Sequence, residues 1–535
     1  MTTDPLTMGP LSADVMRARQ HSTSDALRRT ALRYPAKTAV VAGNRHLTYR
    51  ELDEAATRCA GALTARGLEK GDRLLLLSHN SLEFAVLVFA TARIGVVLTP
   101  VNFMLGAGEI AFILDDCEPA AVVAEAALMP TAAEAINLAH VSPRVRAVAG
   151  AAPDRPDSWE DVAAWLRAAP LNLPEAFLGD DDPVQLLYTS GTESRPKGVL
   201  LPSRSLISQY VSCIVDGGMA ADDIEVHAMP LFHSAQLDCF FSVDVYLGAT
   251  SVILPGPEPA ALLEAIETHR ATKLFCPPTV WISLLRHPDF DRRDLSSLVK
   301  GYYGASAMPV EILRELQERL PKVDLWNFYG QTELAPVATI LKPEEQLTRA
   351  GSAGRPVLNV ETRVVDDDNN PLPPGQVGEI VHRSPQATLG YFRDEAKTSE
   401  AFRDGWFHSG DLGVFDEDGY LTVVDRKKDM IKTGGENVAS REVEEAIYLL
   451  DGVAEVAVFG VPDPRWIEAV VAAVVPKKGA DLTVELIRAH LVTRLAGFKR
   501  PKQIILTSTL PKSASGKILK RELREATPSI ADDAV

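Results

Sequence analysis

Short apolar runs alternate along the chain with longer segments whose apolar residues recur at helical spacing. Residues 73–77 form a continuously apolar run, which is the pattern of a strand buried on both faces. Residues 81–94 have the length of a helix that ends at Gly95, and residues 96–98 form the next apolar run. Further strand-like runs lie at residues 120–123, 145–148, 226–229, 250–254, 273–276, 298–303 and 325–328, with helical segments at 129–139, 258–269 and 310–320. This alternation predicts an α/β fold in which helices cover parallel sheets.

Two helix starts carry capping signals. Thr48 stands at an N-cap position with Glu51 three residues later, which is a capping box, and Gly67 ends that helical segment. Ser203 is expected to cap the helix that begins there. Residues 1–20 are predicted to form a loose arm before the folded part of the chain.

The pattern changes after residue 354, where short strands alternate with polar residues. Residues 354–424 therefore predict a smaller β-rich subdomain, and the charged stretch 425–429 follows as a short joint. Beyond the joint the pattern indicates helices at 440–449 and 484–495 and strands at 453–459, 469–475 and 503–506. We predict a large N-terminal domain of stacked α/β sheets over residues 1–427 and a small mobile α+β C-terminal domain over residues 428–535, with a hinge near Lys428.

Composition and charge narrow the class of protein. A chain of 535 residues exceeds the size at which one hydrophobic core stops growing, so more than one domain is expected. The net charge of −17 disfavours nucleic acid and anionic membranes as partners. Five widely spaced cysteines and no signal peptide predict a cytoplasmic protein without a disulfide framework or zinc site. The most apolar stretch, residues 84–98, is interrupted by Arg93 and Gly95 and is too short to span a membrane.

A loop rich in glycine and hydroxyl groups follows a buried strand near residue 188. It contains Thr189, Ser190, Gly191, Thr192 and Lys197. Glycine lets a backbone approach an anion closely, amides and hydroxyls donate to its oxygens, and lysine adds positive charge. The loop therefore predicts a site for a phosphate chain, although the common order G-x-x-x-x-G-K-[ST] is absent. On the loop alone, a surface turn rich in small polar residues remains the alternative.

Four further motifs follow this loop in order. The five together are YTSGTESRPKGV (188–199), PLFHSAQL (230–237), NFYGQTE (327–333), HSGD (408–411) with DRKKDMIKTGGENV (425–438), and LPKSASGKILK (510–520). Together they resemble the adenylate-forming superfamily, which comprises acyl-CoA synthetases, firefly-type luciferases and the adenylation domains of peptide synthetases. The resemblance runs from about residue 22 to residue 523, and the last motif is most similar to the acyl-CoA synthetase branch.

The resemblance implies two half-reactions. A carboxylic acid attacks the α-phosphate of ATP to give an acyl-adenylate and pyrophosphate, and the thiol of CoA then displaces AMP after the small domain rotates. Glu333 matches the residue that holds Mg²⁺ against the phosphates, and a carboxylate is a suitable ligand for that hard cation. The other ATP- and AMP-binding residues that the resemblance implies are Thr189, Ser190, Gly191, Thr192, Lys197, Gly304, Ala305, Ser306, Tyr329, Gly330, Thr332, Asp411 and Arg426. In this assignment Tyr329 and residues 304–306 form the walls of the adenine slot, and Asp411 binds the ribose.

The C-terminal motifs imply residues that act in different conformations. Lys517 matches a catalytic lysine that contacts carboxylate and phosphate oxygens during adenylation, where its charge offsets the repulsion between two anions. Lys428 matches the hinge position at which a change in backbone dihedrals rotates the last domain. Gly434, Gly435 and Glu436 match the segment that lines the channel for the pantetheine arm of CoA in the second conformation.

The acyl group is expected to lie beside the second motif. His233 matches a gate between the acyl pocket and the adenylate, although a lone histidine is more often a packed residue. The pocket is expected to draw on Phe232, Gln236, Leu237, Trp281, Tyr302 and Tyr303, together with Gly304. This apolar and aromatic lining predicts a hydrophobic acid, either fatty or polycyclic, as the substrate. The sequence does not decide whether the chain forms a homodimer.

One departure from the family pattern bears on activity. Glu193 and Ser194 stand where the family has threonine and glycine, and an acid that faced the triphosphate would repel it. The first alternative to a complete ligase is therefore a variant that only forms the thioester from a supplied acyl-adenylate. Two others remain open, a luciferase-like oxygenase and a non-catalytic ligand-binding protein. The presence of Lys517, Glu333 and Asp411 favours the complete acyl-CoA ligase, which uses ATP, CoA and Mg²⁺.

Overall fold

The computed structural model describes residues 12–169, 178–189, 196–304, 306, 308–433, 436–513 and 518–527. Several predicted site residues lie outside these ranges. They are Ser190, Gly191, Thr192, Ala305, Gly434, Gly435 and Lys517, together with the departure at Glu193 and Ser194.

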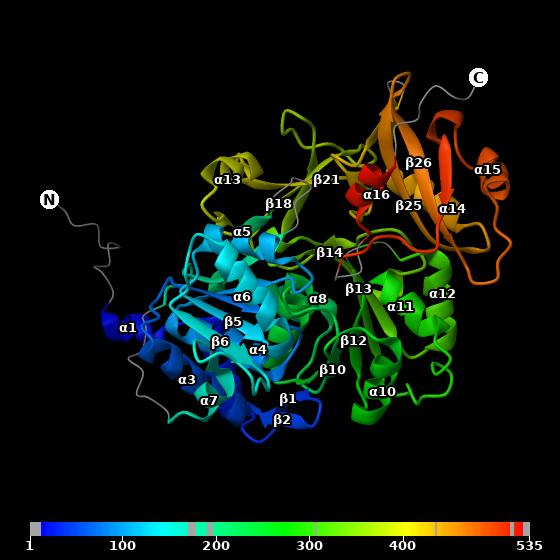
Figure 1. Cartoon of the computed structure of the whole chain (residues 1–535). Helices are drawn as coiled ribbons and strands as arrows, with labels where there is room; N and C mark the ends of the chain where they lie inside the picture. Colours follow the sequence, from blue (N-terminus) through cyan, green and yellow to red (C-terminus); the bar gives the residue numbers. More distant parts are fainter. Residues whose placement is uncertain are drawn as a thin grey trace, which may run out of the picture.

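Two large sheets form most of the N-terminal part (Figure 1). The first has nine strands in the order β16 (Arg355–Pro356), β15 (Val337–Leu341), β14 (Asp324–Gly330), β13 (Lys300–Gly304), β12 (Lys273–Phe275), β10 (Ile224–His227), β11 (Thr250–Ile253), β1 (Thr38–Ala42) and β2 (Arg45–Thr48). The second has eight strands in the order β19 (Gly390–Tyr391), β9 (Lys197–Pro202), β8 (Pro183–Thr189), β4 (Val97–Val101), β3 (Arg73–Leu77), β5 (Ala121–Glu125), β6 (Val145–Ala149) and β7 (Glu160–Asp161). The central strands of both sheets are parallel, as the apolar runs predict.

Helices pack on these sheets through apolar faces. Helix α4 (Leu82–Ile94) is buried at twelve of its positions, which explains why its sequence is apolar all round. Helix α3 (Tyr49–Ala65) begins with the predicted capping box, in which Thr48 and Glu51 satisfy each other's backbone N–H groups. The two helices pack together, and both contribute to the same hydrophobic cluster.

Two local predictions are wrong. Ser203 is the first residue of helix α8 (Ser203–Gly217), whose N-cap is Pro202, and the Ser203 hydroxyl instead accepts a hydrogen bond from the Thr23 N–H at 3.3 Å. The predicted loose arm includes helix α1 (Ala13–Ala18), which Ser12 caps. Ser203 was assigned the wrong role because a serine beside a helix start can serve another partner, whereas the Ser12 cap of α1 was overlooked.

Both edges of the nine-stranded sheet and the β19 edge of the eight-stranded sheet are antiparallel, which the alternation of strands and helices did not indicate. Strand β9 turns back along β8, and β19 pairs with β9 from almost two hundred residues later in the chain. On the other sheet, β15 and β16 continue beyond β14 in antiparallel register. Antiparallel pairing at these edges brings the ends of the glycine-rich loop next to Tyr391.

The rest of the chain forms two smaller sheets. The first comprises β17 (Glu361–Val365), β18 (Gly378–Arg383), β20 (Phe402–Arg403), β21 (Trp406–Phe415) and β22 (Leu421–Arg426). The last comprises β23 (Ile431–Thr433), β24 (Glu436–Val438), β25 (Val453–Asp463), β26 (Ile467–Pro476) and β27 (Gln503–Leu506), with helices α14 (Ser440–Tyr448), α15 (Val484–Val492) and α16 (Lys520–Ala526). Figure 1 shows this C-terminal unit in orange and red at one end of the molecule. Within the described ranges, every helix is too short or too polar to cross a membrane.

Candidate active site

The strand after the glycine-rich loop carries Lys197 to the edge of the eight-stranded sheet. Its ammonium lies 5.4 Å from the centre of the Tyr391 ring, and the Tyr391 hydroxyl donates a hydrogen bond to Glu333 Oε1 at 2.9 Å. Thr189 pairs with Lys197 across the β8–β9 ladder. The first and third motifs therefore meet through Tyr391, a residue that belongs to none of the five motifs.

Tyr329 and Asp411 connect two sheets at the candidate site. Tyr329 lies near the end of β14 in the nine-stranded sheet, and Asp411 lies on β21 of the first smaller sheet. The Tyr329 hydroxyl donates to Asp411 Oδ2 at 2.7 Å, and Arg426 Nε lies 3.4 Å from Asp411 Oδ1. Burial and the nearby Asp411 carboxylate raise the pKa of Tyr329 well above its usual value, so this hydroxyl stays protonated and remains a donor. The third and fourth motifs are thus joined by direct hydrogen bonding.

Lys428 follows this cluster directly in the chain. Burial lowers its pKa to about 8, and the positive charges of Arg426 and Lys197 act in the same direction against weaker opposing effects of Asp429 and Asp411. Lys428, Arg426 and Lys197 thus place three cationic groups within electrostatic reach of one another. A phosphate chain supplies the negative charge that such a group of cations favours.

The second motif joins the third through a pair of hydroxyls. Ser234 Oγ lies 3.0 Å from Thr332 Oγ1, and the residue before Ser234 is His233. The His233 ring lies 4.5 Å from the Phe232 ring, measured between centroids. His233 is partly buried next to this contact, and its role as a gate stays a prediction.

Several residues predicted to line the acyl pocket are engaged in the protein core. The Trp281 indole donates to Tyr302 O at 3.0 Å, and the Tyr302 hydroxyl donates to Gly217 O at 2.7 Å. The Tyr303 hydroxyl donates to Gln346 Oε1 at 2.6 Å. Leu237 is fully buried in the cluster around α3 and α4. These side chains determine the shape of the core beside the site, and their contact with an acyl group stays a prediction.

Gln236 takes part in a buried polar cluster that the sequence did not reveal. Its Nε2 lies 2.7 Å from His227 Nδ1, and its Oε1 accepts from Met229 N–H at 3.2 Å. Both polar atoms of the fully buried Gln236 amide therefore face the protein interior. These contacts occupy both ends of the amide, and the predicted place of Gln236 in the acyl pocket stays a prediction.

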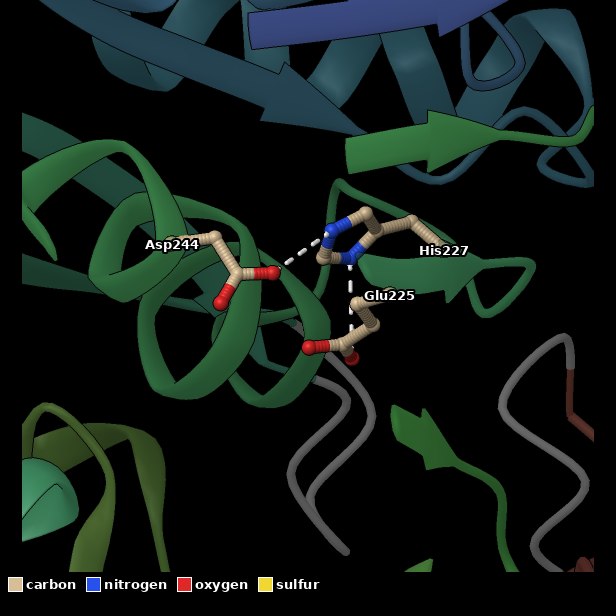
Figure 2. Close-up of side chains that lie close together, drawn as sticks. All are labelled: Glu225, His227 and Asp244. Carbon is tan, nitrogen blue, oxygen red and sulfur yellow. Dashed lines mark ion pairs between the residues drawn. The ribbon is translucent and has the colours of Figure 1, made fainter. Parts of the chain in front are cut away.

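Figure 2 shows Glu225 and Asp244 on two sides of the His227 ring. The three residues form a possible set of metal ligands, and all are fully buried. However, Lys273 Nζ lies 2.7 Å from Glu225 Oε2 and also donates to Asp244 Oδ1. The ammonium group of Lys273 occupies the position of a cation among these carboxylates, so the cluster does not fit a metal ion.

The charges within this cluster are balanced. Burial raises the pKa of Glu225 well above its usual value, whereas Lys273 and His227 lower the pKa of Asp244 despite its burial. The carboxylates keep Lys273 charged, and burial lowers the pKa of His227, which stays neutral. Lys273 is therefore paired with both acidic side chains, and the cluster is best described as a buried structural ion-pair network beside a neutral His227.

Three other predicted residues lie within the described ranges, Gly304, Ser306 and Glu436. Ser306 is exposed, and Gly304 lies at the buried end of β13 against β14. Glu436 is exposed at the start of β24, opposite Thr433 of β23. The last motif reaches the N-terminal part through Lys512, which lines a cavity of about 350 Å³ together with Met229 and Val280.

The profile of the AMP-binding enzyme family matches residues 27–392, and that of the AMP-binding enzyme C-terminal domain matches residues 442–517. The chain belongs to the AMP-binding enzyme family. This AMP-binding enzyme is 37% identical to a feruloyl-CoA synthase from Amycolatopsis sp., over 93% of its length and 97% of the relative. It is 35% identical to the indoleacetate–CoA ligase of Aromatoleum aromaticum (strain DSM 19018 / LMG 30748 / EbN1), over 92% and 95% of the two chains.

Comparison with solved structures supports the same family membership. An anthranilate CoA ligase in complex with anthranoyl-AMP superposes with a TM-score of 0.87 at 28% identity, over 95% of this chain and 97% of the other. ATP-bound MatB from Rhodopseudomonas palustris has a TM-score of 0.85 at 31% identity, over 94% and 98%. These matches confirm the predicted α/β fold with a large and a smaller domain, and the predicted AMP-forming acyl-CoA synthetase of the adenylate-forming superfamily that uses ATP and CoA.

Proposed function

We propose that this AMP-binding enzyme activates a hydrophobic acid with an aromatic ring and performs both half-reactions. The observation that carries the proposal is the convergence of Lys197, Glu333, Tyr329, Asp411 and Arg426, which come from motifs far apart in the chain. The names of three relatives support an aromatic acid, since ferulate, indoleacetate and anthranilate each carry a ring. The Phe232 ring lies beside His233, and Phe103 packs against Phe232, so the side chains near His233 suit such a ring.

In the first half-reaction, a carboxylate oxygen of the acid forms a bond to the α-phosphorus of ATP as pyrophosphate leaves. Lys197, Arg426 and Lys428 offset the negative charge of the phosphates, and Asp411 accepts hydrogen bonds from the ribose. Lys517 then reduces the repulsion between the two anions. An isolated antiparallel β-bridge joins Lys512 to Ile518, which lie on either side of position 517. Lys512 also lines the cavity between the N-terminal part and the C-terminal unit.

Glu333 suits a divalent cation that accompanies ATP. It is partly exposed, and its Oε1 atom accepts the Tyr391 hydrogen bond, which leaves other carboxylate lone pairs for a hard cation. Mg²⁺ bound there would neutralise phosphate charge. The Tyr391 hydroxyl would hold the carboxylate in one orientation while it does so.

In the second half-reaction, the sulfur of CoA forms a bond to the acyl carbon and AMP leaves with the electrons of the acyl–oxygen bond. We assign Gly434, Gly435 and Glu436 to the channel for the pantetheine arm, and Lys428 to the hinge that brings them there. Strand β22 ends at Arg426 and the last sheet begins at Ile431, so Lys428 lies in the short connection between two sheets. The same connection supports the domain boundary at residues 427 and 428.

The test follows the two half-reactions separately with a panel of aryl and fatty acids. Wild-type enzyme with ATP, Mg²⁺ and an aryl acid is expected to release pyrophosphate and, with CoA, to form the thioester. Lys517→Ala is expected to lower pyrophosphate release strongly and to retain thioester formation from chemically prepared acyl-adenylate. Arg521→Ala, which removes an ion pair with Glu525 on α16, is the control.

The outcomes distinguish the alternatives. Thioester formation from supplied adenylate without any acid-dependent pyrophosphate release would support the thioester-only variant that Glu193 suggests. Oxygen consumption with adenylate in the absence of CoA would indicate a luciferase-like oxygenase. Binding of acid and nucleotide without either half-reaction would overturn the proposal in favour of a ligand-binding protein.

Two broader expectations complete the proposal, a cytoplasmic location and a homodimer. Five buried free cysteines fit a reducing compartment, and cell fractionation tests the cytoplasmic location. Light scattering of the purified chain decides the oligomeric state, and a mass near the 58.0 kDa of one chain would exclude the homodimer.

A further inference from the structure

The loop between β3 and α4 holds the segment that leads to His233. Asn80 in this loop donates through Nδ2 to Met229 O at 2.9 Å and to Leu254 O at 3.1 Å, and its Oδ1 accepts from Leu231 N–H at 2.8 Å. Asn80 is only 6% exposed, so these are buried hydrogen bonds. One side chain thus joins the ends of two strands to the start of the PLFHSAQL motif.

These bonds replace the sheet pairing that the chain loses as it leaves β10. Met229 and Leu231 lie on either side of Pro230, which has no N–H to offer. A buried backbone that leaves a sheet must find other partners for its polar groups. The Asn80 carboxamide satisfies a carbonyl before the proline and an N–H after it, and so fixes the direction in which Phe232 and His233 emerge.

A row of aromatic rings supports the same two residues from the side. The ring of His79 stacks on Phe103 with centroids 3.9 Å apart, Phe103 meets Phe232 edge-on at 5.3 Å, and Phe232 lies 4.5 Å from His233. His79 is itself held by Glu125, whose Oε2 accepts from the His79 N–H at 2.8 Å and lies 2.9 Å from Nδ1. The row thus begins at an anchored residue and ends at the predicted gate.

We propose that Asn80 and Phe103 are positioning residues for Phe232 and His233, Asn80 through the backbone and Phe103 through the rings. This inference rests on the proposed function of His233 as the gate between acyl group and adenylate. Neither residue lies in a motif of the family resemblance, and the hydrogen bonds and ring contacts described above connect both of them to the acyl side of the site. Loss of either side chain is therefore expected to weaken binding of the acid and to slow acyl transfer, while the KM for ATP stays unchanged.

The first test replaces Phe103, which is partly exposed on a loop, so we expect the fold to tolerate its removal. Phe103→Ala is expected to raise the KM for the acid and lower the rate of thioester formation by roughly 2- to 10-fold, the range that one aromatic pair supports. The KM for ATP is expected to stay unchanged, and Phe103→Leu to recover part of the loss. Phe402→Ala, which removes a similar partly buried pair with Phe407, is the matched control.

A double-mutant cycle with Phe232→Leu makes the test specific, because coupled residues lose less together than the sum of their separate effects. Additive effects, or an equal rise in the KM for ATP, would overturn the inference. The same kinetic constants are measured for Asn80→Ser and for a control, Asn359→Ser. Asn359 also donates to a backbone carbonyl, Ser208 O at 2.8 Å, but away from the site. If Asn80→Ser fails to fold, the Phe103 variants and their cycle with Phe232→Leu still test the inference.

A spectroscopic measurement separates this inference from the proposed function. Histidine-labelled enzyme gives ring signals, and the His233→Asn variant identifies that of His233. Phe103→Ala is expected to shift this signal while Phe402→Ala leaves it in place. An unmoved signal would contradict the positioning role even in an active enzyme. Inactivity of the wild type with every acid, together with a shifted signal, would contradict the proposed function alone.

Discussion

At the scale of single residues, Tyr391 is the group that holds the proposed magnesium ligand Glu333, and the sequence did not indicate it. It ends a two-residue strand, and only the pairing of β19 with β9 brings it beside Lys197. No motif of the family resemblance contains it. A residue brought to a site by an edge strand from far along the chain leaves no local signal.

We predict that Tyr391→Phe lowers kcat/KM for ATP by roughly 10- to 100-fold, as expected for the loss of one hydrogen bond to a carboxylate. The Glu333 carboxylate would lose the donor that orients it. Pyrophosphate release at varied MgATP measures the effect. Tyr420→Phe, which removes a hydroxyl bond to Glu345, is the control and should leave the kinetics intact. Equal losses in both variants would argue against an oriented Glu333.

The lysine at the predicted hinge gives a pH-dependent signal. With a pKa of about 8, Lys428 is only partly protonated near pH 8 in the free enzyme, because burial and neighbouring cations disfavour its charge. A bound triphosphate favours the charged form, so ATP binding is expected to take up protons near pH 8 and progressively fewer as the pH falls towards about 6.

Calorimetry in two buffers of different ionisation enthalpy measures this uptake. Lys428→Met should remove it. Lys427→Met should not, since that ammonium is already paired with Asp367 at 3.1 Å. A binding enthalpy that is independent of the buffer under the same conditions would show that Lys428 does not approach the phosphates.

At the scale of elements, the end of β14 is unusually intolerant of added atoms. A Cβ at Gly330 would lie 1.9 Å from Pro336 O and 2.8 Å from the Ala338 backbone nitrogen, both of them in the adjacent stretch of chain. The register of β14 and β15 shifts at this point, which lets the two backbones approach. The glycine therefore maintains the position of Tyr329 beside it.

Gly330→Ala is expected to lower the free energy of unfolding by about 1–3 kcal/mol, the usual cost of overpacking, and to weaken ATP binding. Denaturant unfolding and nucleotide titration measure the two effects. Gly256→Ala, where a Cβ would meet no atom within 4 Å, is the control. Full stability and full ATP affinity in the Gly330→Ala variant would show that the backbone near Pro336 shifts to accommodate the added Cβ, which would contradict the prediction.

The elements also show what the sequence could predict. Continuous apolar runs such as β3 and the Thr48 capping box act locally, so they identified strands and a helix start correctly. The turn of β9 along β8 and the late return of β19 depend on pairing between distant segments, which no periodicity records. The same holds for the site, because motifs named Asp411 and Tyr329, whereas their hydrogen bond required the folded chain. Gln236 shows the converse, since its motif position suggested a pocket and its amide faces the buried cluster.

At the scale of the whole molecule, polar contacts around α14 hold the C-terminal unit to the rest of the chain. Arg441 donates to Val423 O at 2.8 Å and to Gly351 O at 3.3 Å, and Asp425 accepts from Ser440 N–H at 2.6 Å. These contacts lie next to the basic connection after β22. They are the contacts that a rotation about Lys428 would have to break.

We predict that Arg441→Ala increases the rate of tryptic cleavage after residues 426–428 by several-fold, because opening of the connection limits access of the protease. Arg488→Ala is the control, since that guanidinium contacts Lys502 O within the C-terminal unit. Gel electrophoresis of timed digests follows the cleavage. Cleavage at the same rate in the wild type and both variants would argue against Arg441 as a restraint on this unit.

The ammonium of Lys273 has a practical consequence for purification and storage. Because the carboxylates of Glu225 and Asp244 surround a cation supplied by the chain itself, dialysis against a chelator has nothing to extract from this cluster. Chelation should therefore abolish adenylation reversibly by removing Mg²⁺ from ATP, while the melting temperature stays constant. A preparation that loses thermal stability in the chelator would reveal a metal ion within the fold.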